Sequence, residues 1–290
     1  MDSENLGESI QVARLNAGLT QQQLCEQTGL SYSTLAKIER GAIKSPSIFT
    51  INLICQGLGI SIEKLLITGV KAESNKPKNG LSKVKESLEN TKIKFIYSDI
   101  NGVLVRFYQR AFASLARDTN QSLDLVEQVF WRYNDAVCMG EMSELELNKI
   151  LAESLEVDEV DWKNYYVSAV EPIKPSHEYL RKLSESYRIG LFSNIFPGYL
   201  DALIEAGKVP NLDYSIIIDS SQVHSIKPSR EIYEIAENKA GVRGGEILFI
   251  DDTRSNIATA QQMGWRGIWF DSYHPEESIK DINQILTADR

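Results

Sequence analysis

Long apolar segments are missing from this chain of 290 residues. No hydrophobic run approaches the ~20 residues needed to cross a bilayer, and the N-terminus lacks the basic and apolar regions of a signal peptide. We therefore expect a cytoplasmic protein with no membrane partner. With 42% hydrophobic and 24% charged residues, the composition is typical of a soluble globular protein. The length predicts one large or two ordinary domains.

Cysteine and histidine are scarce. Cys25, Cys55 and Cys138 are an odd number of cysteines at wide spacing, which predicts neither a disulfide framework nor a thiolate metal site. We expect them to be small apolar side chains in a reducing compartment. The three histidines are equally scattered, so none is assigned to a metal.

Basic residues are few outside one segment of the chain. The net charge is −9, and residues 1–70 carry five Lys or Arg against six Asp or Glu. Residues 71–94 carry seven Lys against three Glu, and the remainder is strongly acidic. We therefore predict a domain at 1–70, a basic linker at 71–92 with a short amphipathic helix through 81–88, and a second domain at 93–290. The linker could attract phosphates or serve only as a solvated spacer.

Glycines and capping residues divide the N-terminal domain into short helices. Residues 10–17 form a pattern ended by Gly18, Thr20 caps a helix that begins at residue 21, and Ser31 caps a third helix that ends at Gly41. Inward positions fall at the spacings of a helix-turn-helix. These positions are Leu24, Cys25, Gly29, Leu30, Leu35 and Ile38. Thr28 alone stands where an apolar residue is usual.

The run GLTQQQLCEQTGLSYSTLAKIERG, followed by SPSIFTINLICQGLGISIEKLL, resembles the Cro/C1-type (XRE family) helix-turn-helix domain. The resemblance implies a homodimer that binds double-stranded DNA, with Gln21 and Gln22 near the phosphate backbone. The recognition helix would present Tyr32, Ser33, Thr34 and Lys37 to the major groove. Because only Arg14, Lys37, Arg40, Lys44 and Lys64 are basic, an interaction domain that does not bind DNA stays open as the alternative.

From residue 93 onward, apolar runs alternate with helical patterns. Strands are expected at 95–97, 189–192, 214–218, 247–250 and 267–270, and helices at 177–186, 197–206, 229–239 and 255–263. This alternation predicts an α/β domain with a doubly wound, Rossmann-like parallel sheet. The helical stretch that follows the first strand, at about 108–171, is expected to form a cap over the carboxyl edge of the sheet.

Polar residues follow each predicted strand. The set is Asp99, Ser193, Asn194, Asp219, Ser220, Ser221, Lys227, Asp251 and Asp252. In open α/β sheets, ligands bind outside the carboxyl ends of the strands. Carboxylates gathered together are costly unless a cation holds them, and Mg²⁺ prefers such oxygen ligands. With a lysine as counter-charge and a serine as hydroxyl donor, the set suits a metal-bound phosphate that is attacked by a carboxylate.

Four ordered motifs, FIYSDINGVLV, GLFSN, SIKPSREIYEIA and ILFIDDTRSNIATAQQMGW, make residues 93–275 resemble the haloacid dehalogenase (HAD) superfamily with a helical cap. The resemblance implies that Asp99 is the nucleophile and becomes an aspartyl-phosphate. It implies Mg²⁺ held by Asp99, Asp252 and the backbone carbonyl of Asn101, with Asp251 at or beside the ion. Ser193 and the adjacent Asn194 would bind phosphoryl oxygens, Lys227 would neutralise charge, and Asn256 would brace the loop.

One residue departs from the pattern of this superfamily. Its phosphatases usually carry Asp two residues after the nucleophile as general acid and base, where this chain has Asn101. An amide cannot exchange that proton, and such a group is typically worth roughly 10² to 10⁴ in rate. The glucose-1-phosphatase-like branch has Gly there, which the resemblance implies still allows turnover. It also has a GEIS-like cap segment comparable with GEMS at residues 140–143, so the chain is most similar to that branch.

Two functions follow from these resemblances. The first is a Mg²⁺-dependent phosphatase of a small phosphorylated metabolite, fused to a DNA-binding domain. The second is a transcriptional regulator whose weakly active or inactive HAD domain senses a phosphorylated ligand. A longer-lived phosphorylated Asp99 that switches the helix-turn-helix is a further hypothesis, and dehalogenation by Asp99 ranks below the first two functions.

Overall fold

The computed structural model describes residues 5–30, 32–40, 43, 46–62, 64–65, 92–106 and 109–288. The predicted linker, apart from Lys92, and the helix predicted at 81–88 lie outside these described residues. The chain divides into two compact units, each described by itself: a smaller one of residues 1–81 with 127–132, here called the N-terminal unit, and a larger one of residues 82–126 and 133–290, called the C-terminal unit. In the described part of the chain, no helix has the length and apolar character to span a membrane.

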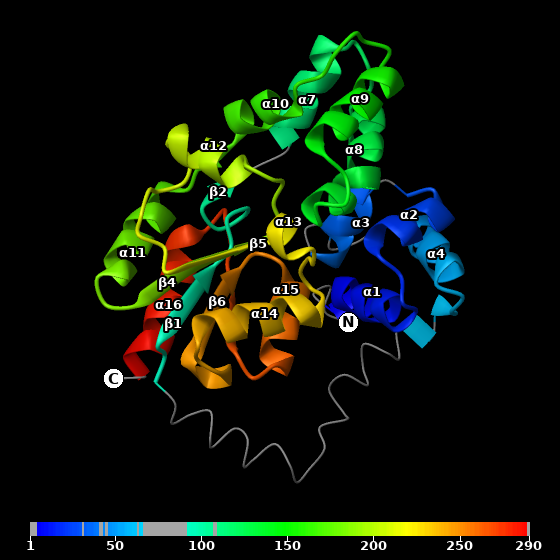
Figure 1. Ribbon diagram of the computed structural model, residues 1–290. Helices are drawn as coiled ribbons and strands as arrows, with labels where there is room; N and C mark the ends of the chain where they lie inside the picture. The colour runs from blue at the N-terminus through cyan, green and yellow to red at the C-terminus, as the bar shows by residue number, and fades with distance from the viewer. Residues whose placement is uncertain are drawn as a thin grey trace. The chain divides into compact units, whose positions relative to one another are not determined.

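The N-terminal unit is entirely helical in its described residues (Figure 1). Its helices are α1 (Asn5–Asn16), α2 (Gln21–Thr28), α3 (Tyr32–Glu39) and α4 (Ile48–Gly57). Thr20 caps α2 by accepting from the backbone N–H of Gln23, whose side chain accepts from the backbone N–H of Thr20. Leu24, Leu35 and Ile54 are fully buried in its core. The helix-turn-helix predicted from glycine and capping positions is therefore confirmed, although α1 begins five residues earlier than predicted.

A buried ion pair joins two of these helices. Arg14 on α1 donates from Nε and Nη2 to Oε1 and Oε2 of Glu39 on α3, at 2.7 and 2.9 Å. Gln21 on α2 donates to the same carboxylate at 2.6 Å. Arg14 was among the few basic residues counted for contact with phosphates, but it is only 5% exposed. Its charge is therefore paired with Glu39 inside the unit and is not exposed for contact with phosphates.

The C-terminal unit is built on a five-stranded sheet in which every neighbouring pair of strands is parallel. The strands are β1 (Phe95–Ser98), β4 (Arg188–Ser193), β5 (Ile216–Asp219), β6 (Ile247–Asp251) and β7 (Arg266–Trp269). Their order is β5-β4-β1-β6-β7. The chain therefore extends from β1 to one side and then returns to the other, as predicted for a doubly wound fold.

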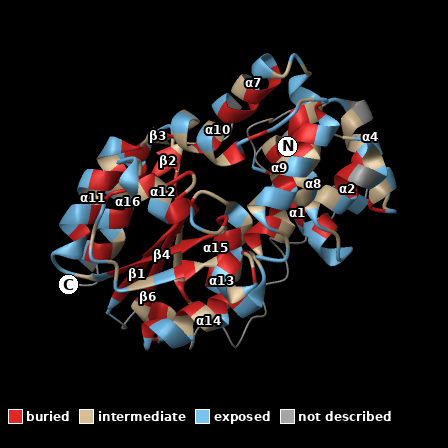
Figure 2. Cartoon of the chain, turned by 45° about the horizontal axis from the view of Figure 1, so that its top comes forward, coloured by how far each residue is buried: buried red, intermediate tan, exposed pale blue. Residues whose placement is uncertain are grey.

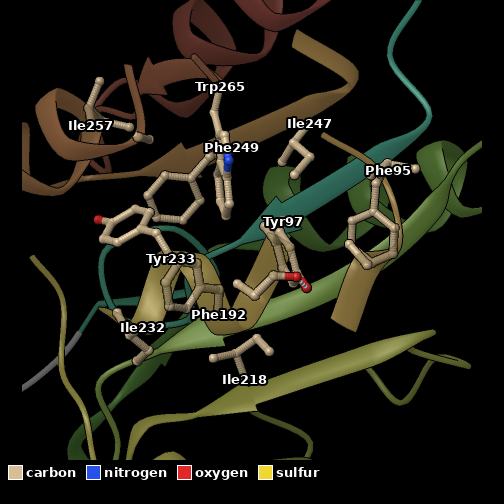
Figure 3. Packing of buried hydrophobic residues seen from close by; sticks show 14 residues of the cluster. Phe95, Tyr97, Phe192, Ile218, Ile232, Tyr233, Ile247, Phe249, Ile257 and Trp265 are labelled. Atoms are coloured by element: carbon tan, nitrogen blue, oxygen red, sulfur yellow. Dashed lines mark hydrogen bonds between the residues drawn. The ribbon is translucent and has the colours of Figure 1, made fainter. Parts of the chain in front are cut away.

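Helices cover both faces of this sheet, and the strands between them are mostly buried (Figure 2). On one face, α14 (Arg230–Ala240) and α15 (Arg254–Gln262) pack against an aromatic core. Figure 3 shows this core, in which the ring centroids of Phe192 and Tyr233 are 5.1 Å apart. On the other face, α11 (Lys174–Ser184) and α16 (Pro275–Ala288) line a small apolar space beside Ser98 and Ile250. The remaining short helices are α12 (Tyr199–Glu205), α13 (Ser220–Val223) and η1 (Gly244–Glu246).

Between β1 and β4, and before α11, the described residues form an insertion of four helices. They are α7 (Gln109–Asp118), α8 (Leu123–Cys138), α9 (Glu144–Ser154) and α10 (Trp162–Ala169). Two short strands enclose this helical insertion, β2 (Val105–Arg106) and β3 (Glu171–Pro172), and they pair antiparallel. The sequence predicted the helices but not this pairing. The role of the insertion as a cap, and the exact domain boundaries, stay predictions.

Candidate active site

Asp99 directly follows β1, the central strand of the sheet. Strands β4 and β6 pair with β1 on either side, so Asp99 lies where the direction of the chain across the sheet reverses. Its backbone N–H donates to the carbonyl of Ile250 at 2.9 Å, and its Oδ1 accepts from the backbone N–H of Ile100 at 2.7 Å. The residue is 6% exposed. Its carboxylate is therefore fixed at the carboxyl edge, as the sequence predicted.

Lys227 lies between two carboxylates. Its Nζ is 3.1 Å from Oδ1 of Asp99 and 2.6 Å from Oδ2 of Asp251, and it also donates to the carbonyl of Phe192 at 2.8 Å. Burial alone would lower the pKa of Lys227, but the charges of Asp251 and Asp99 raise the pKa overall. Lys227 is therefore a permanent cation inside the site.

Asp251 and Asp252 follow β6. Asp251 is fully buried, and its oxygens accept from Lys227, from the side-chain amide of Asn256 and from the backbone N–H of Thr253. Burial is the main cause that raises the pKa of Asp251 to about 8, with smaller contributions from the neighbouring carboxylates. Asp252 has its carbonyl fixed by the indole N–H of Trp269 at 2.7 Å.

The carboxylates of Asp99, Asp251 and Asp252 come together at one point. Each contributes one oxygen to a group in which all these atoms lie within 4.8 Å of one another. Lys227 is the cation that contacts two of them, which leaves an excess of negative charge. A cluster of hard oxygen donors with excess negative charge fits a divalent ion such as Mg²⁺.

Gly102 allows one of these carboxylates to approach the backbone. It adopts φ +84°, and a Cβ atom at this position would lie 2.1 Å from Oδ2 of Asp252. A larger residue would therefore both strain the turn and displace the carboxylate.

Ser193 and Asn194 end β4 beside Asp99. Ser193 is 2% exposed, and its hydroxyl is among the buried side-chain atoms without a hydrogen-bond partner in the described residues. A buried hydroxyl in that state is suited to receive a ligand oxygen. Asn194 instead uses its amide on the backbone of Lys227, donating to the carbonyl at 2.9 Å and accepting from the N–H at 2.8 Å. Its side chain thus holds the lysine loop, and contact with phosphate stays a prediction.

Asn101 follows Asp99 by two residues and contacts the helical insertion. Its Oδ1 accepts from the hydroxyl of Tyr166 on α10 at 2.7 Å. Burial is the main cause that raises the pKa of Tyr166, so its hydroxyl keeps its proton. No sequence pattern indicates a functional role for this tyrosine, because aromatic residues at helical spacing are most often part of a core.

The residues predicted to contact DNA all belong to α2 and α3 of the N-terminal unit. Gln21 and Gln22 begin α2, and Ser33 lies in the first turn of α3. Tyr32, Thr34 and Lys37 are partly exposed on α3, with Tyr32 packed against the core of the unit. These residues therefore lie on the two helices of the helix-turn-helix, where Gln21 already donates to Glu39, and their contact with DNA stays a prediction.

Residues 93–264 match the model of the haloacid dehalogenase-like hydrolase family, and the chain belongs to this family. Residues 10–65 match the helix-turn-helix family. A D-ribitol-5-phosphate phosphatase from Bacteroides thetaiotaomicron is 26% identical over 210 residues, which cover 68% of this chain and 98% of the relative. An (S)-2-haloacid dehalogenase from Pseudomonas sp. (strain YL) is 28% identical over 100 residues, which cover 34% of this chain and 42% of that enzyme.

Solved structures show the same fold. A HAD-like hydrolase from Porphyromonas gingivalis superposes with a TM-score of 0.56 at 22% identity, covering 68% of this chain and 98% of the other. The magnesium complex of a HAD family enzyme from Bacteroides thetaiotaomicron gives 0.54 at 20% identity, covering 63% of this chain and 95% of that enzyme. The protein is thus a HAD family hydrolase with an N-terminal helix-turn-helix.

Proposed function

We propose that this protein is a Mg²⁺-dependent phosphatase of a small phosphorylated metabolite, and that it carries a DNA-binding domain. The observation that carries the proposal is the placement of Asp99 beside Lys227, at the edge where Asp251, Asp252 and the partnerless hydroxyl of Ser193 gather. The relative named as a D-ribitol-5-phosphate phosphatase supports phosphate-ester hydrolysis of a small metabolite, without fixing the leaving group.

Each residue has a distinct part in this reaction. Asp99 attacks phosphorus and forms an aspartyl-phosphate, while the leaving group departs with the electrons of the broken P–O bond. Lys227 lies 3.1 Å from Asp99 and offsets the negative charge that a bound phosphate adds. The Ser193 hydroxyl donates to a phosphoryl oxygen. Water then attacks the aspartyl-phosphate and releases inorganic phosphate.

Asp99, Asp252 and the backbone carbonyl of Asn101 would hold Mg²⁺. Asp251 also lies within the carboxylate cluster, but its oxygens already accept from Lys227, Asn256 and Thr253, so it serves mainly to hold Lys227 in place. The bound ion supplies electrostatic stabilisation of the charge on the transferring phosphoryl group. A magnesium complex of a structural neighbour supports this ion.

Phosphate release with Mg²⁺ tests this function. The panel contains p-nitrophenyl phosphate, acetyl phosphate and sugar, polyol and nucleotide monophosphates, each given to wild type and Asp99→Asn. We expect turnover in the wild type and none in Asp99→Asn, since an amide is not a nucleophile of this kind. Wild-type turnover that survives in Asp99→Asn would show a different reaction centre.

Asn101 favours a second candidate function. Because its side chain cannot act as a general acid or base, the protein could serve as a transcriptional regulator whose HAD domain binds a phosphorylated ligand and turns it over slowly. In this case the affinity of the full chain for DNA changes when the ligand of the HAD domain is added. An unchanged affinity in the presence of each bound phosphate would exclude this candidate.

The N-terminal unit is proposed to bind double-stranded DNA as a homodimer in the cytoplasm. Lys37 is partly exposed on α3, as such contact requires, whereas Arg14 is buried against Glu39. With so few basic side chains, one copy neutralises few phosphates, and a dimer doubles that number.

A further inference from the structure

The hydrogen bond between Tyr166 and Asn101 decides which end of the amide faces other partners. An asparagine side chain has one acceptor oxygen and an NH₂ group with two donors. Since Oδ1 of Asn101 accepts from Tyr166 at 2.7 Å, the NH₂ group is the end left to meet a ligand. The tyrosine is 1% exposed and packs against Tyr199, with ring centroids 5.3 Å apart and the rings tilted by 44°, so its hydroxyl has little freedom to move.

Apart from the Ser193 hydroxyl, which is assigned to a phosphoryl oxygen, the side-chain donors named around Asp99 are engaged with protein atoms. The hydroxyl of Tyr166 donates a hydrogen bond to Oδ1 of Asn101, and Lys227 donates to the carbonyl of Phe192 and contacts Asp99 and Asp251. Asn101 can donate a hydrogen bond, but an amide does not release its proton to a leaving group. The side chain two residues after the nucleophile is thus a donor only.

We propose that Tyr166 is a positioning residue that directs the NH₂ group of Asn101 toward the leaving oxygen, and that this pair restricts the enzyme to phosphates whose leaving group departs as a weak base. Aryl and acyl phosphates belong to this class, and alkyl phosphates do not. The inference rests on the proposed phosphatase function and narrows its substrate class.

The chemical step needs no proton from the protein. An oxygen of Asp99 forms a bond to phosphorus while the bond from phosphorus to the leaving oxygen breaks, and both electrons of that bond stay with the leaving oxygen. The oxyanion departs with a hydrogen bond from Asn101 and later takes a proton from water. A phenolate or carboxylate is stable enough to leave in this way, whereas an alkoxide needs a proton as it departs.

Substrates with graded leaving groups test the proposal. We would measure kcat/KM for p-nitrophenyl phosphate, phenyl phosphate, acetyl phosphate and glycerol 3-phosphate, because kcat/KM reports the step that forms the aspartyl-phosphate. For wild type we expect a steep fall with increasing basicity of the leaving group. For Asn101→Asp we expect a gain of about 10²-fold or more on glycerol 3-phosphate, and so a flatter dependence.

Tyr166→Phe tests the positioning role. We expect a loss of about threefold to tenfold in kcat/KM for p-nitrophenyl phosphate, the size of one lost hydrogen bond. Tyr165→Phe is the matched control, because this neighbour on α10 donates to an exposed carboxylate, that of Asp118, at 3.2 Å. Combined with Asn101→Asp, Tyr166→Phe should also reduce the increase in kcat/KM on glycerol 3-phosphate. A merely structural loss would lower kcat/KM for glycerol 3-phosphate and p-nitrophenyl phosphate alike.

Each outcome decides between the proposals. Wild-type turnover of glycerol 3-phosphate within about tenfold of p-nitrophenyl phosphate would overturn the inference and leave the phosphatase function standing. Equal effects of Tyr166→Phe and Tyr165→Phe would overturn the positioning role. If Tyr166→Phe does not fold, the slopes of wild type and Asn101→Asp still decide the substrate class. No turnover of any phosphate would overturn the phosphatase function and the inference with it.

Discussion

At the scale of single residues, substitution of Gly102 has two separate effects: it strains the backbone, and it displaces a carboxylate of the proposed metal site. Gly102→Ala places a methyl group 2.1 Å from the Asp252 carboxylate at φ +84°. We expect a loss of roughly 1–3 kcal/mol in the free energy of unfolding and, in addition, a large loss of Mg²⁺ affinity. Denaturant titration and calorimetric titration with Mg²⁺ measure the two effects separately.

Gly198 supplies the control for this variant. It has φ +74° with no atom within 4 Å of the Cβ position. Gly198→Ala should therefore show a similar loss of stability while its affinity for Mg²⁺ stays that of the wild type. Equal Mg²⁺ affinity in the two variants would mean that Asp252 does not hold the ion.

His177 makes the stability of the C-terminal unit depend on pH. Its Nε2 bonds the carbonyl of Leu104 at 2.9 Å, and burial is the main cause that lowers the pKa of this histidine from 6.5. The folded state therefore binds fewer protons than the unfolded state just below pH 6.5, and stability is full above that pH and falls as the pH drops. The variant His177→Gln is the control, because a glutamine side chain can donate to the carbonyl of Leu104 but does not titrate.

We expect the free energy of unfolding of the wild type to fall more steeply between pH 7 and pH 5.5 than that of His177→Gln. The difference in slope can approach that of about one proton. Denaturant titrations across this pH range provide the measurement. If the free energy of unfolding depends on pH in the same way for the two proteins, His177 has the same pKa in the folded and unfolded states.

The sequence predicted residues that lie within motifs and missed those fixed by distant contacts. Asp99, Asp251 and Asp252 each end or directly follow a strand, so the parallel sheet brings them together. Lys227 lies in the loop after α13, and the sequence motif rather than the sheet indicated it. Tyr166 reaches Asn101 from a helix 65 residues away, and no local pattern encodes that distance. The burial of Arg14 against Glu39 is a contact of the same kind, which explains why Arg14 was counted as a surface charge.

At the scale of elements, Gly190 in β4 lets the central strands pack closely. A Cβ atom there would lie 2.7 Å from the ring of Tyr97, 2.8 Å from that of Phe95 and 2.9 Å from the carbonyl of Ile216. Gly190→Ala should therefore lower the free energy of unfolding by roughly 1–3 kcal/mol through overpacking. Thermal and denaturant unfolding provide the measurement.

A second variant tests the cause. Phe95→Leu combined with Gly190→Ala should recover part of the loss, because one ring is relieved while the carbonyl of Ile216 stays in place. If the two changes simply add, the methyl group does not press on that ring.

Helices and strands with a clear hydrophobic pattern were predicted well, whereas strands that form only by pairing with a distant segment were not. The strands β1, β4 and β6 are mostly buried apolar runs, β5 and β7 are mostly half-buried, and each of the five appears within two residues of its predicted ends. Strands β2 and β3 hold two residues each and exist only because they pair with one another. Helix α16 also escaped prediction, although residues such as Ile282 and Leu286 bury its inner face.

At the scale of the whole molecule, each unit has its own buried core, one of aliphatic residues and the other rich in aromatic rings. The smaller unit buries only a small core, and a unit of this kind is only marginally stable. Losing the Arg14–Glu39 pair inside this unit would therefore remove a large part of its free energy of unfolding. The HAD unit has a larger core, so we expect its free energy of unfolding to be larger than that of the N-terminal unit.

Glu39→Ala should consequently unfold one unit and spare the other. Removing one partner leaves Arg14 buried without a counter-charge, which costs about 3–5 kcal/mol. We expect calorimetry of the full chain to show loss or a large downward shift of the transition of the N-terminal unit, together with loss of DNA binding. Added Mg²⁺ should still raise the transition of the HAD unit, and phosphate release should persist.

Glu234→Ala is the control for this variant, because Glu234 pairs with Arg230 on the surface of α14, where both side chains are more than half exposed. Such a pair contributes about 0–1 kcal/mol, so neither transition should move by more than a few degrees. A parallel loss of both transitions in Glu39→Ala would show that the two units unfold as one. The HAD domain would then depend on the helix-turn-helix for its stability, and ligand binding at Asp99 would stabilise the DNA-binding unit by the same linkage.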